Sequence, residues 1–401
     1  YRRLYNKCYR LRGYKMKICV ITDSLFRMGG AQRVVVDVLN RMIDDNDITV
    51  VMPFSNHKNI FKLDDRVKLV NLNELSGSVH KFYRVLGAVN HRTKIFNHRI
   101  FNGVMKKSIA SKKKRIKFNN FLRENNFDVI VGVQATGLFR LSLIDDDIEA
   151  RTVGWVHSTY DAYFNKRAYA MYGYESLVKE VAKKINHLIV LTQKDKNKFD
   201  KNFNINSDVM YNPINIDRNF APQERDKDKL LFMGRVLINI KGLDRIIAIM
   251  KKIIAIRPNI HLDIVGDGTD FQKVKSMIEE NNLQNNITMV GRADDLVDYY
   301  SKSKLLLMTS RWEGMSMSVL EAFSYALPAV SFHTNGTDEI ITDGKEGYLV
   351  DQGNIDTFVS KILELLDDEN KWNEMSKNCY ERANDFDMEV IIKKFENMLE
   401  N

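Results

Sequence analysis

The sequence contains few cysteines and no long apolar run, and these two absences exclude several classes of protein. Its three cysteines are Cys8, Cys19 and Cys379, an odd number without the short spacings of a metal site. They provide neither a disulfide framework nor a structural zinc site, which favours a reducing, cytoplasmic compartment. No run approaches the roughly 18 apolar residues that a membrane-spanning helix requires. We expect the 401 residues to form two or three globular domains.

Acidic residues are absent between Glu74 and Glu124, where basic and aromatic residues alternate. The basic residues are Lys81, Arg84, Arg92, Lys94, Arg99, Lys106, Lys107, Lys112, Lys113, Lys114, Arg115, Lys117 and Arg123, and the aromatic ones are Phe82, Tyr83, Phe96, Phe101, Phe118 and Phe121. This pattern suits an anionic membrane or another anionic polymer, and a solvated lysine-rich surface is the alternative. Nucleic acid is not expected, because the chain has no RNA- or DNA-binding motif.

From this region we predict peripheral association with the inner face of an anionic membrane. Residues 106–117 would dock on the bilayer, and Phe118 and Phe121 would insert between the lipids. Residues 1–15 form a basic segment before Met16, which reads as the opening of the first strand. We interpret them as a basic N-terminal extension, because they lack the apolar stretch of a secretory signal.

Short β-rich runs alternate with helical patterns throughout the chain. The first half has such runs at residues 17–22, 48–52, 67–72, 129–133, 152–156 and 187–191. The second half has them at 230–233, 262–265, 287–290, 304–308, 329–332 and 348–350. Strands separated by helices predict parallel sheets with right-handed crossovers. We therefore predict an α/β fold, with two Rossmann-like doubly wound domains facing a central cleft and helices at the C-terminus.

The same patterns give domain boundaries. The N-terminal domain should cover residues 16–211, followed by a linker at 212–228 that contains a charged stretch. The second domain should cover 229–375. Residues 376–401 read as C-terminal helices that could pack back on the N-terminal domain.

Two carboxylates eight positions apart lie in the most informative segment of the sequence. Glu313 follows the strand predicted at 304–308, at the edge of the sheet where ligands of open α/β folds bind. Glu321 lies one to two turns into the next helix, whose first amides are unpaired and suited to an anion. A loop carboxylate, free amides and a second carboxylate match a ligand made of sugar, diphosphate and ribose.

Glycines and cations follow the other strands. Gly29 and Gly30 open the first helix, where the backbone could approach a ligand, with a plain tight turn as the alternative. They do not form the G-x-G-x-x-G fingerprint of a nicotinamide enzyme. In the second half, Gly234 and Arg235 end one strand and Lys241 opens the following helix. An arginine fork and a lysine point charge can clamp a diphosphate, with unrelated surface cations as the alternative.

Two further strand ends carry weaker signals of the same kind. Gly266 follows the strand at 262–265, and Gly291 and Arg292 follow the strand at 287–290. Both places allow the backbone to approach a nucleotide. Asp145, Asp146 and Asp147 follow an apolar run, and we interpret them as a solvated turn rather than a metal-binding loop.

Taken together, these motifs resemble those of the retaining family 4 glycosyltransferases, which have the GT-B fold. Residues 28–34 look like that family's glycine loop, 234–235 with 241–244 like its diphosphate clamp, and 313–321 like its Glu-x7-Glu motif. The segments 327–330, 338–341 and 347–350 continue the pattern. The resemblance is dense over about 230–352 and thin between roughly 53 and 150.

The sequence departs from the family's pattern in three places. Six positions separate Arg235 from Lys241, one more than in the family's motif, and Ala326 stands where the family usually has glycine. Residues 212–214 replace a hinge that is richer in glycine.

The resemblance implies transfer of a sugar from a nucleotide sugar with retention of configuration, without a bound metal or a cofactor. It assigns Arg235 and Lys241 to the diphosphate, Glu313 to the donor sugar and Glu321 to the ribose. It also places His157, at the end of the strand predicted at 152–156, near the reacting sugar, with a structural role as the alternative. The predicted catalytic residues are thus His157, Arg235, Lys241 and Glu313, and the donor-binding residues are Gly29, Gly30, Gly234, Gly266, Arg292, Gly314, Met315, Ser316 and Glu321.

The leading interpretation is a hexosyltransferase of bacterial surface-glycan biosynthesis. It would move a hexose or N-acetylhexosamine, with UDP as the expected carrier, to a lipid-linked or anionic acceptor bound by the N-terminal domain. One alternative is transfer to a protein or to a soluble polymer such as a teichoic acid. Another is a catalytically silent GT-B subunit that only binds a partner enzyme, which the intact clamp and both glutamates disfavour.

Overall fold

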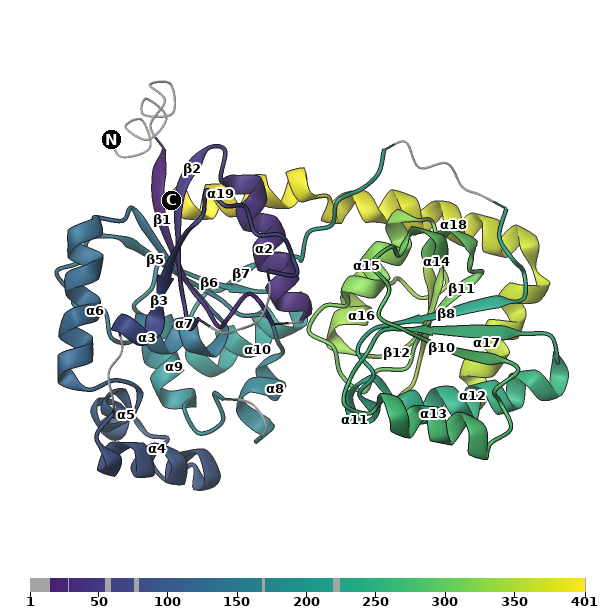
Figure 1. Cartoon of the computed structure of the whole chain (residues 1–401), viewed down its shortest axis with the longest axis horizontal. Coiled ribbons are helices and arrows are strands. Elements are labelled where there is room, and N and C mark those ends of the chain that lie inside the picture. The colour runs from purple at the N-terminus through teal and green to yellow at the C-terminus, as the bar shows by residue number, and fades with distance from the viewer. Residues whose placement is uncertain are drawn as a thin grey trace. The chain divides into compact units, whose positions relative to one another are not determined.

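The computed structural model describes residues 15–27, 29–54, 59–75, 79–167, 170–218 and 224–400. The chain divides into two compact units, Tyr1–Tyr211 with Ile391–Asn401, and Asn212–Val390. In each unit, helices lie on both faces of a parallel sheet (Figure 1). Three parts of the sequence predictions lie outside the described residues: most of the basic extension at 1–14, Met28 of the glycine loop, and 219–223 of the linker.

The first unit contains a seven-stranded sheet of order β3-β2-β1-β4-β5-β6-β7. Its strands are β1 (Met16–Ile21), β2 (Asn46–Met52), β3 (Lys68–Asn71), β4 (Val129–Val133), β5 (Arg151–Trp155), β6 (His187–Val190) and β7 (Asp208–Val209). Its helices are α2 (Gly30–Met42), α3 (Leu72–Leu75), α4 (Lys81–Thr93), η1 (Arg99–Phe101), α5 (Asn102–Ile109), α6 (Lys112–Asn125), α7 (Gln134–Leu141), α8 (Tyr160–Asn165), α9 (Glu175–Ala182) and α10 (Gln193–Phe203). Six of these strands coincide with predicted runs, whereas the two-residue β7 is too short to leave a pattern.

The second unit contains a six-stranded sheet of order β10-β9-β8-β11-β12-β13. Its strands are β8 (Lys229–Met233), β9 (His261–Val265), β10 (Ile287–Gly291), β11 (Leu305–Met308), β12 (Ala329–Phe332) and β13 (Gly347–Val350). The helices after Tyr211 are α11 (Ile238–Lys241), α12 (Leu243–Ile256), α13 (Phe271–Glu280), α14 (Val297–Lys302), α15 (Met317–Ser324), α16 (Asn335–Ile340), α17 (Ile355–Asp367), α18 (Glu369–Ala383), η2 (Asn384–Phe386) and α19 (Met388–Glu400). The predicted α/β fold with two doubly wound sheets is confirmed.

Apolar residues at strand and helix spacing explain both sheets. All four residues of β11 are buried, as expected of a central parallel strand that is covered on both faces. In α12, Ile246, Ile249, Met250 and Ile253 recur at intervals of three and four and form a buried stripe. Lys251 and Lys252 lie on the exposed face of the helix, so the stripe determines which side packs on the sheet.

Both sheets reverse their strand order at one point. In the second unit the chain runs outward from β8 through β9 to β10, then returns to β11 on the other side of β8. The crossovers therefore leave β8 on one face and β11 on the other, and ligands of open α/β sheets bind at the carboxyl ends of such a strand pair. The corresponding pair in the first unit is β1 and β4.

The boundary between the units falls within α19. Residues of α19 from Ile391 onward belong to the first unit, where the Phe395 ring lies 5.2 Å from the Trp155 ring. The Arg151 guanidinium donates a 2.7 Å hydrogen bond to the carbonyl of Leu399. In the second unit, the amide of Ile214 donates to the carbonyl of Phe386 at 2.9 Å.

Candidate functional site

The ends of β8 and β9 approach each other closely through glycine. Gly266 has a φ of 134°, and a Cβ at this position would lie 2.0 Å from the carbonyl oxygen of Gly234. Any side chain would collide with that backbone, so only glycine allows both the torsion angle and the contact. The amide of Gly234 also donates to the carbonyl of Val265 at 3.0 Å. The two predicted glycines thus form a backbone floor at the switch point.

Two cations follow β8, and their surroundings differ. The Arg235 side chain is exposed and makes no hydrogen bond or ion pair with any described residue. Lys241 ends the short helix α11, and its Nζ lies 3.8 Å from where a Cβ of Gly234 would be. The chain therefore turns back over the end of β8 despite the extra residue between Arg235 and Lys241. The fold brings both cations of the predicted clamp to this strand end.

The Glu313 carboxylate lies beside Lys241. Its Oε1 accepts hydrogen bonds from Lys241 Nζ and, at 2.7 Å, from Ser310 Oγ. Both side chains of the ion pair are largely buried, with 15% of Lys241 and 12% of Glu313 exposed. The sequence separates these residues by 72 positions, so it could not indicate that they pair. Ser310 was also missed, because no spacing rule distinguishes it from other loop serines.

The loop that carries Glu313 is held by an ion pair to α12. The Arg311 guanidinium makes two hydrogen bonds to the Asp244 carboxylate, at 2.9 and 2.7 Å, and a third to the carbonyl of Ile238. Burial would raise the pKa of Asp244, but the hydrogen bonds and charge of Arg311 outweigh it, so the pKa lies below its ordinary value. Asp244 therefore stays charged, and a two-pronged contact of this kind restricts the loop in both distance and orientation.

The backbone between Glu313 and α15 offers free amides. Among the described residues, the amides of Gly314, Met315 and Ser316 have no hydrogen-bond acceptor, and no side chain caps α15. Gly336 fixes the path of this segment, because its amide donates to the Glu313 carbonyl at 3.2 Å. Unpaired amides at the start of an α-helix attract an anion. The segment thus presents free amides at a helix N-terminus, the groups that the sequence analysis assigned to phosphate or sugar oxygens.

Glu321 lies in the second turn of α15 and is held by an aromatic pair. Its Oε2 accepts a 2.7 Å hydrogen bond from the Tyr300 hydroxyl. The Tyr300 ring stacks on Tyr325, with centroids 5.5 Å apart and an interplanar angle of 4°. Tyr300 belongs to α14 and gave no signal in the sequence, because it acts on the site by positioning another side chain.

The contacts of Arg292 do not include the other candidate site residues. Its guanidinium Nε is 3.6 Å from Asp294 Oδ1, and both side chains are exposed. No contact within the described part of the chain joins it to Arg235, Lys241 or Glu313. The role of Arg292 in donor binding therefore stays a prediction that no direct contact with the other candidate residues supports.

The predicted residues of the first unit follow its own strands. Gly29 is the N-cap of α2, which begins at Gly30 after the loop that follows β1 and has no side-chain cap. His157 follows β5, and its amide donates to the Tyr163 hydroxyl at 3.2 Å. The His157 ring lies 4.4 Å from the Trp155 ring, so aromatic packing orients it. These residues provide a second helix N-terminus and an imidazole at strand ends of the first unit.

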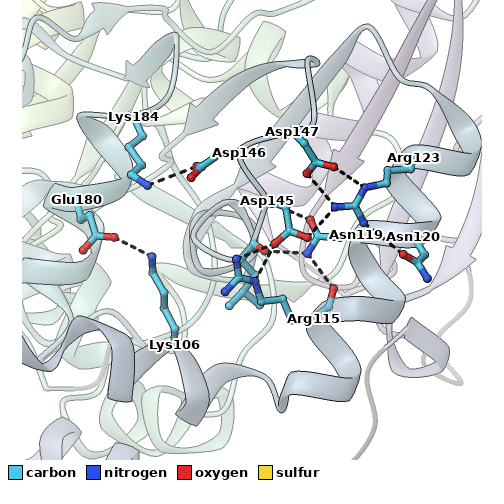
Figure 2. A network of polar contacts seen from close by, with 11 residues as sticks. Lys106, Arg115, Asn119, Asn120, Arg123, Asp145, Asp146, Asp147, Glu180 and Lys184 are labelled. Carbon is cyan, nitrogen blue, oxygen red and sulfur yellow. Dashed lines mark hydrogen bonds and ion pairs between the residues drawn. The ribbon is translucent and has the colours of Figure 1, made fainter.

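The basic region of the first unit is partly neutralised, as Figure 2 shows. Arg115 pairs with Asp145 at 2.7 Å, and Arg123 pairs with both Asp145 and Asp147 at 2.9 and 2.8 Å. Asp146 and Asp147 of the aspartate turn are exposed, whereas Asp145 is partly buried, and Asp145 and Asp147 provide counter-charges for α6. Nearby, Lys106 pairs with Glu180 at 2.7 Å.

The prediction that Phe118 and Phe121 insert into a membrane is wrong. Phe118 is buried, with 2% of its surface exposed, and belongs to the hydrophobic core of the first unit together with Leu122. Phe121 is partly buried and packs against Phe127 at 5.8 Å. The helical spacing of these residues turns them toward the core rather than toward solvent. Among the described residues, no helix is both long and apolar enough to cross a bilayer.

Residues 214–383 match the protein-family model described as "Glycosyl transferases group 1". This segment coincides with most of the second unit, which therefore resembles the group 1 glycosyltransferases.

Known proteins extend the similarity to the whole chain. An uncharacterized glycosyltransferase of Haemophilus influenzae is 20% identical over 96% of this chain and 99% of its own length. The poly(glycerol-phosphate) alpha-glucosyltransferase of Bacillus subtilis is 30% identical over 46% of this chain, but this covers only 28% of that protein. A Staphylococcus aureus TarM structure in complex with Fondaparinux, alpha-GlcNAc-glycerol and UDP superimposes with a TM-score of 0.75, at 18% identity, over 96% of this chain and all of that one. The fold is thus that of the GT-B glycosyltransferases.

Proposed function

We propose that the chain is a metal-independent, retaining hexosyltransferase of the family 4 type, with a UDP-sugar as donor. The observation that carries the proposal is the convergence of Arg235, Lys241 and Glu313 at the ends of β8 and β11, next to the N-terminus of α15. This arrangement provides positive charge for a diphosphate and a carboxylate for sugar hydroxyls within one unit. The TarM structure that shares the fold contains UDP, which supports this choice of nucleotide.

The proposed chemistry places the positive charges where negative charge develops. As the bond between sugar C1 and the diphosphate oxygen breaks, the β-phosphate takes up the electron pair. Arg235, Lys241 and the amides at the start of α15 stabilise that charge, which is worth several kcal/mol in a site shielded from water. The acceptor hydroxyl attacks C1 from the same face, and its proton passes to a β-phosphate oxygen. Attack on this face retains the configuration of the sugar.

The ion pair between Lys241 and Glu313 gives both residues a role in this reaction. A diphosphate that binds Lys241 replaces Glu313 as its counter-charge, which leaves the carboxylate to accept hydrogen bonds from the sugar hydroxyls. Ser310 holds the carboxylate in place during that exchange. Glu321, oriented by Tyr300, accepts hydrogen bonds from the ribose hydroxyls. His157 of the first unit contributes to the binding of the reacting sugar.

We propose an anionic, phosphate-containing acceptor, bound by the first unit, in bacterial surface-glycan biosynthesis. It is either a lipid-linked glycan at the cytoplasmic face of the membrane, where the chain associates peripherally, or a polyol-phosphate polymer. Arg84 and Arg92 of the basic region are exposed and have no ion-pair partner among the described residues, which supports an anionic partner. The Bacillus subtilis relative is named for transfer to poly(glycerol-phosphate), which supports the polymer as the second candidate.

A binding screen followed by a transfer assay tests the donor. Purified protein is heated with each of a panel of nucleotide sugars, because a donor that binds the folded state raises its melting temperature. UDP-sugars should stabilise the chain and ADP- or GDP-sugars should not. Each stabilising donor is then incubated with lipid extract or with poly(glycerol-phosphate), and NMR determines the anomeric configuration of the product. Binding without transfer to any acceptor would favour the silent-subunit alternative, and inversion would contradict the retaining mechanism.

Metal independence has a separate test. The activity should be unchanged by EDTA, because Arg235 and Lys241 would compensate the diphosphate charge that Mg²⁺ compensates in other enzymes. Activity that disappears with EDTA and returns with Mg²⁺ would contradict this part of the proposal.

A further inference from the structure

Helix α4 buries Asn90 and Gly87 on its inner face and exposes large apolar side chains on its outer face. Asn90 is fully buried, and its side chain donates to the carbonyl of Gly173 at 2.5 Å and accepts from the amide of Phe96 at 2.9 Å. Gly87, on the same inner face, lies so close to Tyr174 that a Cβ would be 2.9 Å from its hydroxyl. Polar contacts and close backbone packing therefore fasten this helix to the first unit. A helix on the surface of a globular protein ordinarily buries its apolar stripe instead.

The outer face of α4 exposes large apolar side chains. Phe82, Val85 and Val89 are 59%, 51% and 38% exposed, and their spacing of three and four positions places them on one stripe. Ile95 and Ile100, in the segment that leads through η1 to α5, are 64% and 75% exposed. Figure 1 shows α4 beside α5, at the outside of the first unit. An exposed apolar stripe of this kind marks a surface that a partner covers.

Uncompensated cations lie on the same segment. These cations are Lys81, Arg84, Arg92 and Arg99. All four side chains are exposed, and none makes a hydrogen bond or an ion pair with a described residue. No acidic residue occurs between Glu74 and Glu124, so the segment has no counter-charge of its own. Helix α6 differs in part, because its Arg115 and Arg123 are paired with aspartates (Figure 2), whereas its Lys112 and Lys113 are exposed.

We propose that α4 and η1 form the surface with which the first unit docks on an anionic lipid bilayer. The charge of the segment selects anionic headgroups, and the stripe of Phe82, Val85 and Val89 enters the boundary between headgroups and acyl chains. This inference deepens the membrane association in the proposed function and rests on it. It moves the membrane contact from residues 106–117, where the sequence placed it, to residues 81–101.

Co-sedimentation with vesicles tests the proposal on the full chain. Neutral vesicles contain phosphatidylcholine alone, and anionic vesicles contain phosphatidylcholine with phosphatidylglycerol. Wild type should bind only the anionic vesicles. Each basic residue near such a surface strengthens binding roughly fivefold, so Arg84→Gln/Arg92→Gln should bind about 30-fold more weakly. The charge-matched control is Lys112→Gln/Lys113→Gln in α6, which should bind like wild type.

The apolar contribution needs its own pair of variants. Val85→Ser/Val89→Ser should lose the part of the binding that persists at high salt, because salt screens charges but leaves apolar insertion intact. The control is Ile256→Ser/Val297→Ser, which removes two exposed apolar residues of the second unit, 61% and 43% exposed. In Phe82→Trp, lipids brominated on their acyl chains should quench additional fluorescence that wild type lacks.

The outcomes separate this inference from the rest of the proposed function. Loss of binding in the α6 variant and retention in both α4 variants would overturn it while leaving membrane association in place. Binding of no vesicle, together with dimerisation that the α4 variants abolish, would show a contact between copies of the chain and would also overturn it. All four double variants should bind UDP-sugars like wild type, since none lies among the donor-site residues, so donor binding reports on the proposed activity independently.

Discussion

Arg235 and Lys241 differ in how much of their charge is already compensated, and this difference separates two effects of mutation. Arg235→Ala should lower kcat/KM by roughly 30- to 1,000-fold, equivalent to about 2–4 kcal/mol of lost transition-state stabilisation. Its stability should stay unchanged, because Arg235 is exposed and contacts no described partner. Lys241→Ala should impair transfer less and also lower the free energy of unfolding by about 1–3 kcal/mol, since it leaves the largely buried Glu313 carboxylate without its cation.

Steady-state kinetics and urea unfolding measure the two effects. The control is Lys275→Ala, an exposed lysine of the second unit on α13, which should change neither quantity. Wild-type turnover in Arg235→Ala would remove the diphosphate assignment.

Substitutions of Glu313 and Glu321 should change different kinetic parameters. Glu313→Gln should mainly lower kcat, because this carboxylate orients the reacting sugar, whereas Glu321→Gln should mainly raise KM for the donor. Tyr300→Phe should resemble a weaker Glu321→Gln, since it removes the hydrogen bond that positions Glu321. Initial rates over a range of donor concentrations distinguish the two patterns, and a reversed pattern would exchange the two roles.

At the scale of single elements, the end of α15 contains a strained residue. Ala326 has a φ of 54°, in the left-handed region, where the resembling family usually has glycine. Ala326→Gly should raise the free energy of unfolding by up to about 1 kcal/mol, because relief of the strain exceeds the extra flexibility of glycine in the unfolded chain. Ala255→Gly, at an exposed position within α12, should lower it by a similar amount. Thermal unfolding compares the two, and destabilisation by both would show that Ala326 is not strained.

The junction of β13, α17 and α18 should depend on pH through one carboxylate. Burial would raise the pKa of Glu364, but hydrogen bonds from Lys361, Lys371 and Tyr348 outweigh it and lower the pKa to about 2. A depressed pKa stabilises the folded state above the unfolded value near 4.5, and this contribution is lost as the pH falls toward 2. Urea unfolding of wild type and Glu364→Gln should therefore differ most at pH 6 to 7 and converge below pH 3. A difference that does not depend on pH would show that packing, rather than charge, is responsible.

At the scale of the whole molecule, the donor and the membrane should protect different segments from hydrogen exchange. UDP at 100 times its Kd stabilises the state that binds it by about 2.7 kcal/mol. Hydrogen exchange should then slow in residues 234–242 and 313–321, with no change in 81–101. Anionic vesicles should slow exchange in 81–101 without UDP. Mass spectrometry of peptides from the full chain measures both, and protection of 81–101 by UDP alone would connect the segment to donor binding.

The sequence by itself determined the elements of the fold and the identity of most candidate site residues. Short apolar runs identified the strands and period-3.6 patterns identified the helices, because a parallel strand or a helix must bury a continuous apolar surface in any fold that contains it. Gly234, Arg235, Glu313 and Glu321 were found because they follow strands, and the carboxyl ends of parallel strands meet at one edge of a sheet.

Only the tertiary structure decided which side chains meet and which face solvent. The ion pair of Lys241 with Glu313 and the hydrogen bond of Tyr300 to Glu321 join residues from different elements, and no local pattern reports such distances. The basic region shows the same limit. Its composition indicated an anionic partner, but only the packing shows that α6 buries Phe118 while α4 turns Phe82 toward solvent. Amphipathic patterns define a helical stripe, and the surrounding elements determine whether that stripe is covered.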